Sequence, residues 1–272
     1  MDLSYLGIFS HSIIGIFLTA LVTAIVGCYI VVRRMAFIAG GVTHSSFAGL
    51  GLGFYLGRSP ILFAMIAAIL SGLGVEYLSR GKQVREDSAI AAIWSLGMAL
   101  GVLFTFLTPG YSPGLSAFLF GNILLVTRMD LILLGVYLVL TLIGVTRYYY
   151  PLLFVSFDEE YGRTRGLPVS TLRSLMMVWT CIGVVLSIRA LGIMMLMSML
   201  TLPQMTVNLF TSDFRKLLVG SSILSIVSGF AGLVSSFYLN LPTGACTILL
   251  LSLIFLLAKW RQNLLHRGIK RA

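Results

Sequence analysis

Long apolar runs, separated by short charged or proline- and glycine-rich breaks, organise this chain of 272 residues. A helix that crosses the hydrocarbon core of a bilayer needs about 20 apolar residues. We expect the first run to be a span rather than a cleavable leader, because it is longer than the apolar core of a leader. The pattern predicts membrane-spanning helices at residues 9–32, 36–57, 60–78, 88–107, 128–146, 171–188, 190–210, 215–239 and 243–259.

The composition agrees with a chain that lies largely within a membrane. Hydrophobic residues make up 58% of it and charged residues only 10%. Closely spaced spans leave no room for a large soluble domain, so we expect one transmembrane domain over residues 1–272. The predicted fold class is all-α, a polytopic bundle of about eight or nine membrane helices.

The basic residues indicate how the bundle is oriented. The net charge is +10, but the Lys and Arg residues lie in alternate breaks between the spans and form no single basic face for a nucleic acid. If the N-terminus is outside, all of the 19 Lys and Arg except Arg58, Arg128 and Arg189 fall in inner loops or the C-terminal tail. The positive-inside rule therefore predicts an outer N-terminus and a cytoplasmic C-terminus.

Two breaks are longer than the others. Residues 108–127 begin with two Pro-Gly turns and continue with an apolar run too short to cross, so we expect a short helix in or re-entering the outer interface. Residues 147–173 form the longest polar segment and contain the consecutive acids Asp158, Glu159 and Glu160. On the expected topology this segment faces the cytoplasm, where it can meet a partner.

A stripe of small residues marks the second predicted span, "AFIAGGVTHSSFAGLGLGFYLG". Its members recur every four residues and so share one side of a helix, a pattern that lets two membrane helices approach closely. They are predicted helix-packing residues: Gly41, Ser45, Gly49, Gly53 and Gly57.

His44 is an ionisable residue beside this stripe, at membrane depth. Such residues usually mark a substrate or proton path, and a neutral imidazole is a common ligand for zinc and related ions. The alternative is a buried histidine that donates to a neighbouring carbonyl. The spacing alone leaves both interpretations open.

Four further polar residues are candidates for lining a path: Thr43, Asn122, Gln204 and Asn208. Pro203 precedes Gln204 and predicts a kink whose freed carbonyls could line a cavity, although a kink with interhelical hydrogen bonds explains the same residues. The methionines between 194 and 205 point all round a helix and favour ordinary packing over a soft-metal relay. His11 and the three separate cysteines are likewise expected to be interfacial or packing residues.

Enzymatic signatures are missing from the sequence. We find no HExxH, no GxSxG and no GxxxxGK[ST] phosphate loop. We therefore expect no enzyme and no cofactor bound by this chain. If ATP powers transport, another subunit must hydrolyse it.

Two segments resemble the permease subunits of bacterial metal-ion ABC transporters, which import zinc, manganese or iron(II). In "AFIAGGVTHSSFAGLGLG" the matching residues are Ala36, Ile38, His44, Gly49, Leu52 and Gly53. In "FDEEYGRTRGLP" they are Phe157, Asp158, Glu160, Arg163, Arg165, Gly166 and Pro168. "FLFGNILLV" and "LNLPTGACTILLLSLIFLLA" extend the likeness, in matching order, over nearly the whole chain.

The resemblance implies a multi-pass subunit of a bacterial plasma membrane, in contact with lipid. Its implied partners are cytoplasmic ATP-binding subunits in two copies, a second permease copy in a homodimer, and an extracytoplasmic solute-binding protein. A coupling segment at about 156–170 would fit a groove in the ATPase. Its residues would be Asp158, Glu159, Glu160, Tyr161, Gly162, Arg163, Arg165, Gly166, Leu167 and Pro168.

The sequence departs from the family pattern at Gly40, where members have an aspartate four residues before the histidine. Asn122 likewise stands where many members have an acid. A divalent cation at membrane depth without a carboxylate lacks charge compensation. Nitrogen ligation without a hard oxygen favours zinc over manganese, with iron(II) also possible, and a metal chelate or other small complex is the alternative substrate.

Overall fold

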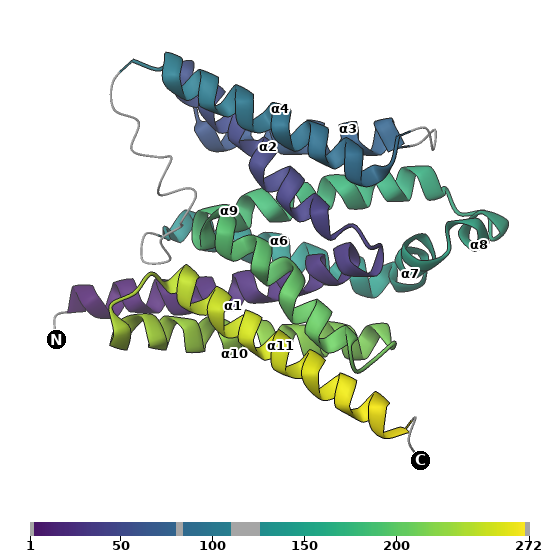
Figure 1. The fold of residues 1–272 in the computed structure, drawn as a ribbon. Helices are drawn as coiled ribbons and strands as arrows, with labels where there is room; N and C mark the ends of the chain where they lie inside the picture. The colour runs from purple at the N-terminus through teal and green to yellow at the C-terminus, as the bar shows by residue number, and fades with distance from the viewer. Residues whose placement is uncertain (1–2, 80–83, 110–125, 270–272) are drawn as a thin grey trace.

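The computed structural model describes residues 3–79, 84–109 and 126–269, and this part of the chain contains helices but no strands (Figure 1). The predicted all-α fold is confirmed. The short helix expected within 108–127 lies mostly outside the described residues. The helices are α1 (Leu3–Val32), α2 (Ala36–Tyr55), α3 (Pro60–Ser79), α4 (Glu86–Leu107), α6 (Arg128–Arg147), α7 (Tyr149–Phe157), α8 (Glu159–Thr164), α9 (Val169–Asn208), α10 (Phe214–Leu239) and α11 (Thr243–Ile269).

Most of these helices can cross a membrane. Among the described residues, 7 helices are long and apolar enough: α1, α3, α4, α6, α9, α10 and α11. Helix α2 occupies the predicted span 36–57 but is not one of them, because His44 and the glycine, serine and threonine residues lower its mean hydropathy. Most of its side chains are buried against protein, so α2 does not need a lipid-facing surface.

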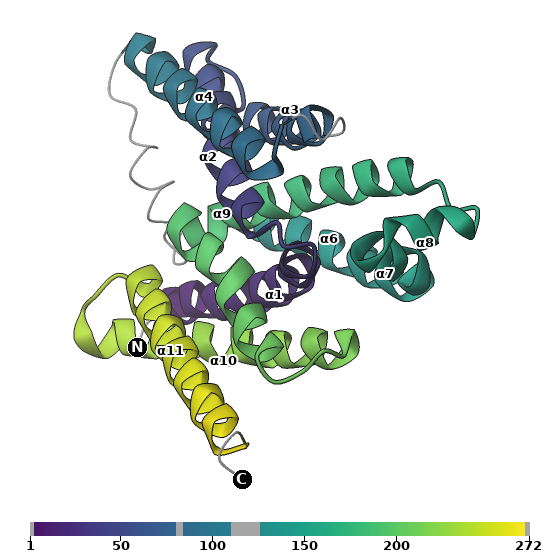
Figure 2. The ribbon, with the colours of Figure 1, turned by 45° about the vertical axis from the view of Figure 1, so that its right-hand side comes forward.

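Helix α9 contains a break that divides it into two arms. Gly192 has φ 71° and ψ 164°, a backbone conformation that is essentially restricted to glycine. Figures 1 and 2 show the ribbon of α9 running from α8 to the opposite end of the bundle, turning back sharply and returning to the end where α10 begins. The two arms correspond to the predicted spans 171–188 and 190–210.

An ion pair fixes this turn to the start of α6. Asp130 is only 4% exposed and accepts a hydrogen bond from Arg189, which lies just before the break. Asp130 also completes a capping box with Thr127, whose hydroxyl and backbone N–H both donate to its carboxylate. The pair therefore joins the first turn of α6 to the end of the first arm of α9.

The bundle consists of two groups of helices with α9 between them (Figure 2). Helix α2 packs chiefly on α3 and α4, and α1 packs chiefly on α9 and α10. The two chain termini lie at opposite ends of the bundle, and α7 and α8 extend from the end at which α1 stops and α9 starts (Figure 1). The segment between α6 and α9 is thus a helical projection rather than a structureless loop.

Candidate functional site

The small-residue stripe of α2 divides between two neighbouring helices. A methyl group on Gly41 would lie 2.6 Å from Ile90 Cγ2 of α4, and one on Gly53 would lie 2.6 Å from the Pro60 Cα of α3. Gly49 approaches the α3 backbone at the Phe63 carbonyl, and Ser45 packs against Gly97 of α4. The close approaches hold α2 between α3 and α4, and so set the position of His44.

Gly57 differs from the other members of the stripe. It lies beyond the end of α2, has φ 62°, and would have no atom within 4 Å of an added methyl group. Its backbone N–H donates to the Phe54 carbonyl at 3.1 Å. Gly57 therefore forms the turn after α2, and its predicted role in helix packing is wrong.

The His44 imidazole stacks on the Trp94 indole of α4. Their ring centroids are 4.5 Å apart and their planes differ by 8°. His44 Nδ1 is buried and has no hydrogen-bond partner within the described part of the chain. This nitrogen does not donate to a neighbouring carbonyl there, and in the neutral tautomer that carries its proton on Nε2 it has an unused lone pair.

The space beside Gly40 is filled by two side chains from other helices. A methyl group on Gly40 would lie 2.8 Å from Met197 Cε and 2.9 Å from Trp94 Cζ3. An aspartate side chain at this position would therefore overlap both. The missing carboxylate is replaced by the indole of α4 and the thioether of the second arm of α9.

The structure describes three of the four other candidate path residues, and no hydrogen bond joins any of these three to His44. The Thr43 hydroxyl donates to the Ala39 carbonyl of its own helix at 2.7 Å. Gln204 is buried, and its Nε2 donates to the Thr23 carbonyl at 3.0 Å, which ties α9 to α1. Asn208 is exposed at the C-terminal end of α9, and Asn122 lies outside the described residues.

The predicted coupling segment has its own local structure. Asp158 caps α8 by accepting a hydrogen bond from the Tyr161 N–H at 2.9 Å. Gly166, with φ 73°, ends α8, while Leu167 N–H returns to the Gly162 carbonyl at 3.1 Å. Pro168 immediately precedes α9. These features make residues 158–168 a short helix with a defined exit.

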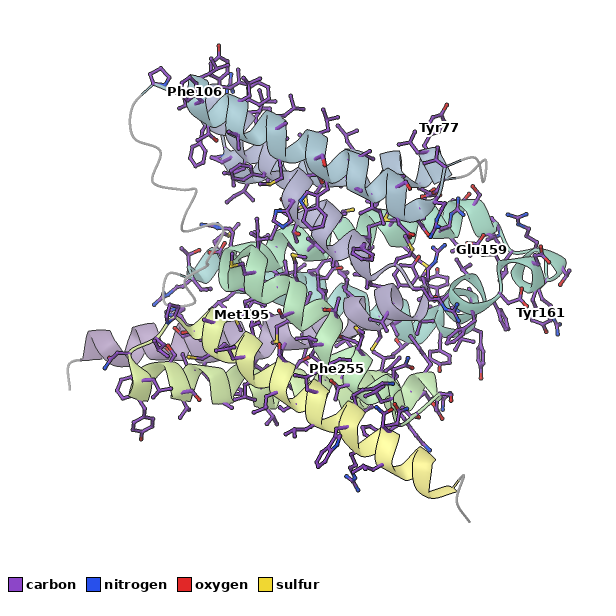
Figure 3. The ribbon with its side chains drawn as sticks, in the orientation of Figure 1. Tyr77, Phe106, Glu159, Tyr161, Met195 and Phe255 are labelled. Carbon is purple, nitrogen blue, oxygen red and sulfur yellow. The ribbon has the colours of Figure 1, made fainter. Side chains whose placement is uncertain are left out.

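The two faces of α8 differ in charge and exposure. Tyr161 lies at the outer tip and stacks under Arg165, whose Nη2 donates to its hydroxyl at 2.7 Å (Figure 3). Glu160 and Arg163 are also exposed. Glu159 instead faces the bundle (Figure 3). The outer face can therefore meet a partner while the inner face contacts the membrane helices.

An ion-pair network connects this inner face to the spans. Glu159 accepts a hydrogen bond from Arg33 at 2.9 Å and lies 3.6 Å from Arg173 at the start of α9. Arg173 donates in turn to Glu76 of α3 at 3.1 Å. Burial works against the charge of Arg33, but the nearby Tyr29 and Glu159 outweigh it and raise the pKa of Arg33 above its usual value. The sequence gives no sign that Arg33 and Glu76 take part.

A spanning helical bundle with a short capped helix at one end is the architecture of a polytopic membrane subunit. The profile of the ABC 3 transport family matches residues 6–262. The chain belongs to this family, and its resemblance to the permeases of metal-ion ABC transporters is confirmed.

Individual relatives cover most of the chain. It is 33% identical over 248 residues to an uncharacterized membrane protein of Synechocystis, covering 91% of this chain and 88% of the relative. It is 30% identical over 242 residues to the manganese transport system membrane protein MntC of Halalkalibacterium halodurans, covering 89% and 82%. The structure of PsaBC from Streptococcus pneumoniae in complex with Fab matches with a TM-score of 0.81 and 25% identity, covering 92% and 90%.

Proposed function

We propose that this chain is the membrane-spanning subunit of an ATP-driven importer of a divalent transition metal in a bacterial plasma membrane. Family membership and the name of the MntC relative support metal as the cargo. A separate ATP-binding subunit hydrolyses ATP, and this chain binds no cofactor. The N-terminus is outside and the C-terminus is cytoplasmic, because that orientation puts the basic loops inside.

The observation that carries this proposal is the unpartnered Nδ1 of His44. An imidazole without a competing hydrogen bond can bind a metal ion as it passes. No group of three His, Cys, Asp or Glu that could hold a metal is found in the described residues. His44 is therefore a transit contact, and water, carbonyl oxygens or another subunit complete the coordination of the ion.

The filled space beside Gly40 bears on the identity of the cargo. Imidazole without a carboxylate favours zinc, whereas the MntC relative is named for manganese, and iron(II) takes similar ligands. A metal chelate is the second candidate, because Trp94 and Met197 occupy the space of the carboxylate that a bare ion would use. A chelated metal brings its own ligands and needs fewer from the protein.

The coupling segment connects conformational changes of the ATP-binding subunits to the membrane helices. Two permease copies, a homodimer, bind two ATP-binding subunits through the exposed face of α8, and an extracytoplasmic solute-binding protein delivers the cargo. Motion of α8 passes to the spans through the contacts of Glu159 with Arg33 and Arg173. ATP binding and hydrolysis then rock the two permeases between two arrangements that open to opposite sides.

Metal uptake tests this function. The chain is placed in vesicles with the ATP-binding subunit and the solute-binding protein, and zinc, manganese, iron(II) and a zinc chelate are supplied separately. We expect His44→Ala to lower uptake of the transported species at least about tenfold, the effect of about 1.4 kcal/mol of lost contact energy. The control is His11→Ala, a histidine far from α2 along the chain. Unchanged uptake in His44→Ala would reduce His44 to a packing partner of Trp94.

A further inference from the structure

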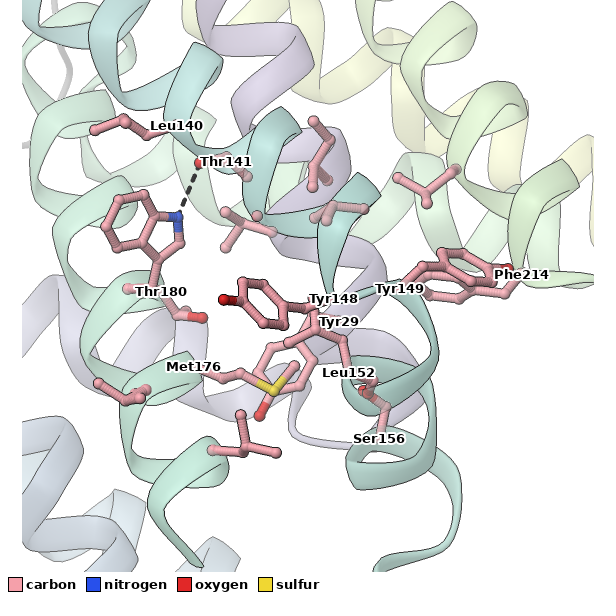
Figure 4. Close-up of a pocket in the computed structure, with 18 residues that line it drawn as sticks. Tyr29, Leu140, Thr141, Tyr148, Tyr149, Leu152, Ser156, Met176, Thr180 and Phe214 are labelled. Atoms are coloured by element: carbon pink, nitrogen blue, oxygen red, sulfur yellow. Dashed lines mark hydrogen bonds between the residues drawn. The ribbon is translucent and has the colours of Figure 1, made fainter. Parts of the chain in front are cut away.

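A cavity of about 530 Å³ lies between α1, α6, α7, α9 and α10, apart from His44 (Figure 4). Tyr29 and Tyr148 both point into it, and Thr141 and Met176 also lie on its wall (Figure 4). It lies toward the end of the bundle that carries α8, since α7 forms part of its wall. No described residue of the proposed transport path lines it.

Four polar side chains of the cavity wall are engaged within the protein. Trp179 Nε1 donates to the Thr141 hydroxyl at 2.9 Å, and the Ser156 hydroxyl donates to the Leu152 carbonyl at 2.6 Å. The Tyr29 hydroxyl accepts a hydrogen bond from Arg33 at 2.8 Å. Apart from the hydroxyls of Tyr148, Tyr149 and Thr180, the remaining surface is apolar, so the cavity suits an apolar guest.

The cavity is bordered by apolar side chains on the outside of the bundle. Leu140, Tyr148 and Leu175 line it and are 49%, 53% and 60% exposed. In a membrane-spanning chain, such outward-facing apolar side chains meet the hydrocarbon region. An acyl chain can therefore enter from the side.

Positive charge gathers beside the cavity. The Arg147 guanidinium lies 5.6 Å from the centre of the Tyr148 ring, and that of Arg215 lies 5.2 Å from the centre of the Tyr149 ring. Both tyrosines line the cavity. Lys216 follows Arg215 and is also exposed.

Asp213 is an acidic neighbour of Arg215 and Lys216. Its carboxylate caps α10 and accepts hydrogen bonds from the backbone N–H groups of Arg215 and Lys216. Arg147, Arg215 and Lys216 outnumber Asp213 on this side of the cavity, and Glu159 is paired with Arg33, so the charge beside Tyr148 and Tyr149 is positive. Basic pockets between membrane helices are suited to anionic lipid headgroups.

We propose that an anionic phospholipid occupies this site, with one acyl chain in the cavity and its phosphate against Arg147, Arg215 and Lys216. A second copy of the chain is disfavoured as the occupant, because a symmetric contact would bring two identical basic rims together. The lipid also touches Tyr29, which holds Arg33 and, through it, Glu159 of the coupling segment. Lipid binding thus supports the inner face of α8.

Two glycines of α6 provide a matched test. An added methyl group at either Gly144 or Gly135 meets no atom within 4 Å, but only Gly144 lines the cavity. The full chain, purified in detergent, is incubated with phosphatidylglycerol or with phosphatidylcholine of the same acyl chains, and bound lipid is counted by native mass spectrometry. We expect the wild type and Gly135→Leu to retain one phosphatidylglycerol, and Gly144→Leu to lose it.

The headgroup contact is tested by replacing Arg147, Arg215 and Lys216 together with Gln. We expect the preference for phosphatidylglycerol, at least about tenfold in the wild type, to fall to nearly none. If Gly144→Leu fails to fold, Leu175→Trp fills the entrance instead. The proposal is overturned if a folded cavity-filling variant retains the lipid, if the wild type retains both lipids equally, or if filling the cavity dissociates a dimer and leaves the lipid count unchanged. These lipid measurements do not depend on transport, so the lipid proposal and the proposed transport function can fail independently of each other.

Discussion

The Trp94 indole lies flat against the His44 imidazole, with 4.5 Å between the ring centroids. The same indole, together with Met197, fills the space beside Gly40. Helices α2, α4 and α9 therefore meet at one point, and the imidazole has an aromatic and a thioether neighbour in place of a carboxylate. Any movement of α4 or of the second arm of α9 changes the surroundings of His44.

The packing around Gly40 predicts that even one added methyl group is harmful there. We expect Gly40→Ala to lower the free energy of unfolding by about 1–3 kcal/mol, because the Trp94 ring must move. The measurement is the melting temperature of the purified chain in detergent. Gly135→Ala on α6 is the control. It meets no atom within 4 Å and should be neutral or stabilising by up to about 1 kcal/mol.

A restored carboxylate extends this test to transport. Gly40→Asp alone should destabilise the chain, whereas Gly40→Asp combined with Trp94→Ala and Met197→Ala has room for the carboxylate. We expect the triple variant to take up manganese better relative to zinc than the wild type does, since an oxygen ligand suits manganese. An unchanged ratio of manganese to zinc uptake would show that position 40 does not select the metal.

The spans and the candidate histidine could be predicted from sequence because both are local signals. The length of an apolar run shows whether it can cross a bilayer, and an ionisable side chain within such a run is rare enough to mark a candidate site. Trp94 and Met197 could not be predicted as neighbours of His44, because they lie far along the chain on other helices. Periodicity gives the faces of a helix but not which helices meet.

The coupling segment shows the same limit. Three consecutive acids indicated a segment that meets a partner, yet their individual roles depend on which way each side chain points. Asp158 caps α8 and Glu159 contacts Arg33, while Glu160 is exposed. The break in α9 is similar: it occurs at Gly192, just inside the predicted span 190–210, because its backbone conformation is one that essentially only glycine adopts.

Gly192 is predicted to be intolerant of any side chain. Its φ of 71° and ψ of 164° lie in a region that other residues essentially do not occupy. We expect Gly192→Ala to cost about 1–3 kcal/mol of unfolding free energy, measured by thermal melting. Gly144→Ala serves as the control, because an added methyl group meets no atom within 4 Å there. Equal melting temperatures for the two variants would contradict a strained turn at Gly192.

The Asp130–Arg189 pair is predicted to stabilise the turn between the arms of α9. Arg189→Met leaves the buried Asp130 carboxylate without its positive partner, and we expect a loss of about 2 kcal/mol after allowing for the partial exposure of Arg189. Asp130→Asn with Arg189→Met removes both charges and should recover part of this loss. The exposed Arg58→Met is the control, with an effect within about 0.5 kcal/mol. Thermal melting of all three variants checks the prediction.

Glu159, but not its neighbour Glu160, is predicted to be needed for coupling ATP hydrolysis to metal transport. Glu159→Gln removes the negative charge that Arg33 and Arg173 share, and we expect about 1–3 kcal/mol less stability and several-fold less metal transported per ATP hydrolysed. The ATP-binding subunit should still bind, because the outer face of α8 is unchanged. Glu160→Gln alters an exposed acid and should leave transport per ATP as in the wild type. Uptake and phosphate release measured on the same vesicles give this ratio. Loss of ATPase binding in Glu159→Gln would instead place Glu159 in the docking surface, since a contact that only transmits motion can be weakened without releasing the partner.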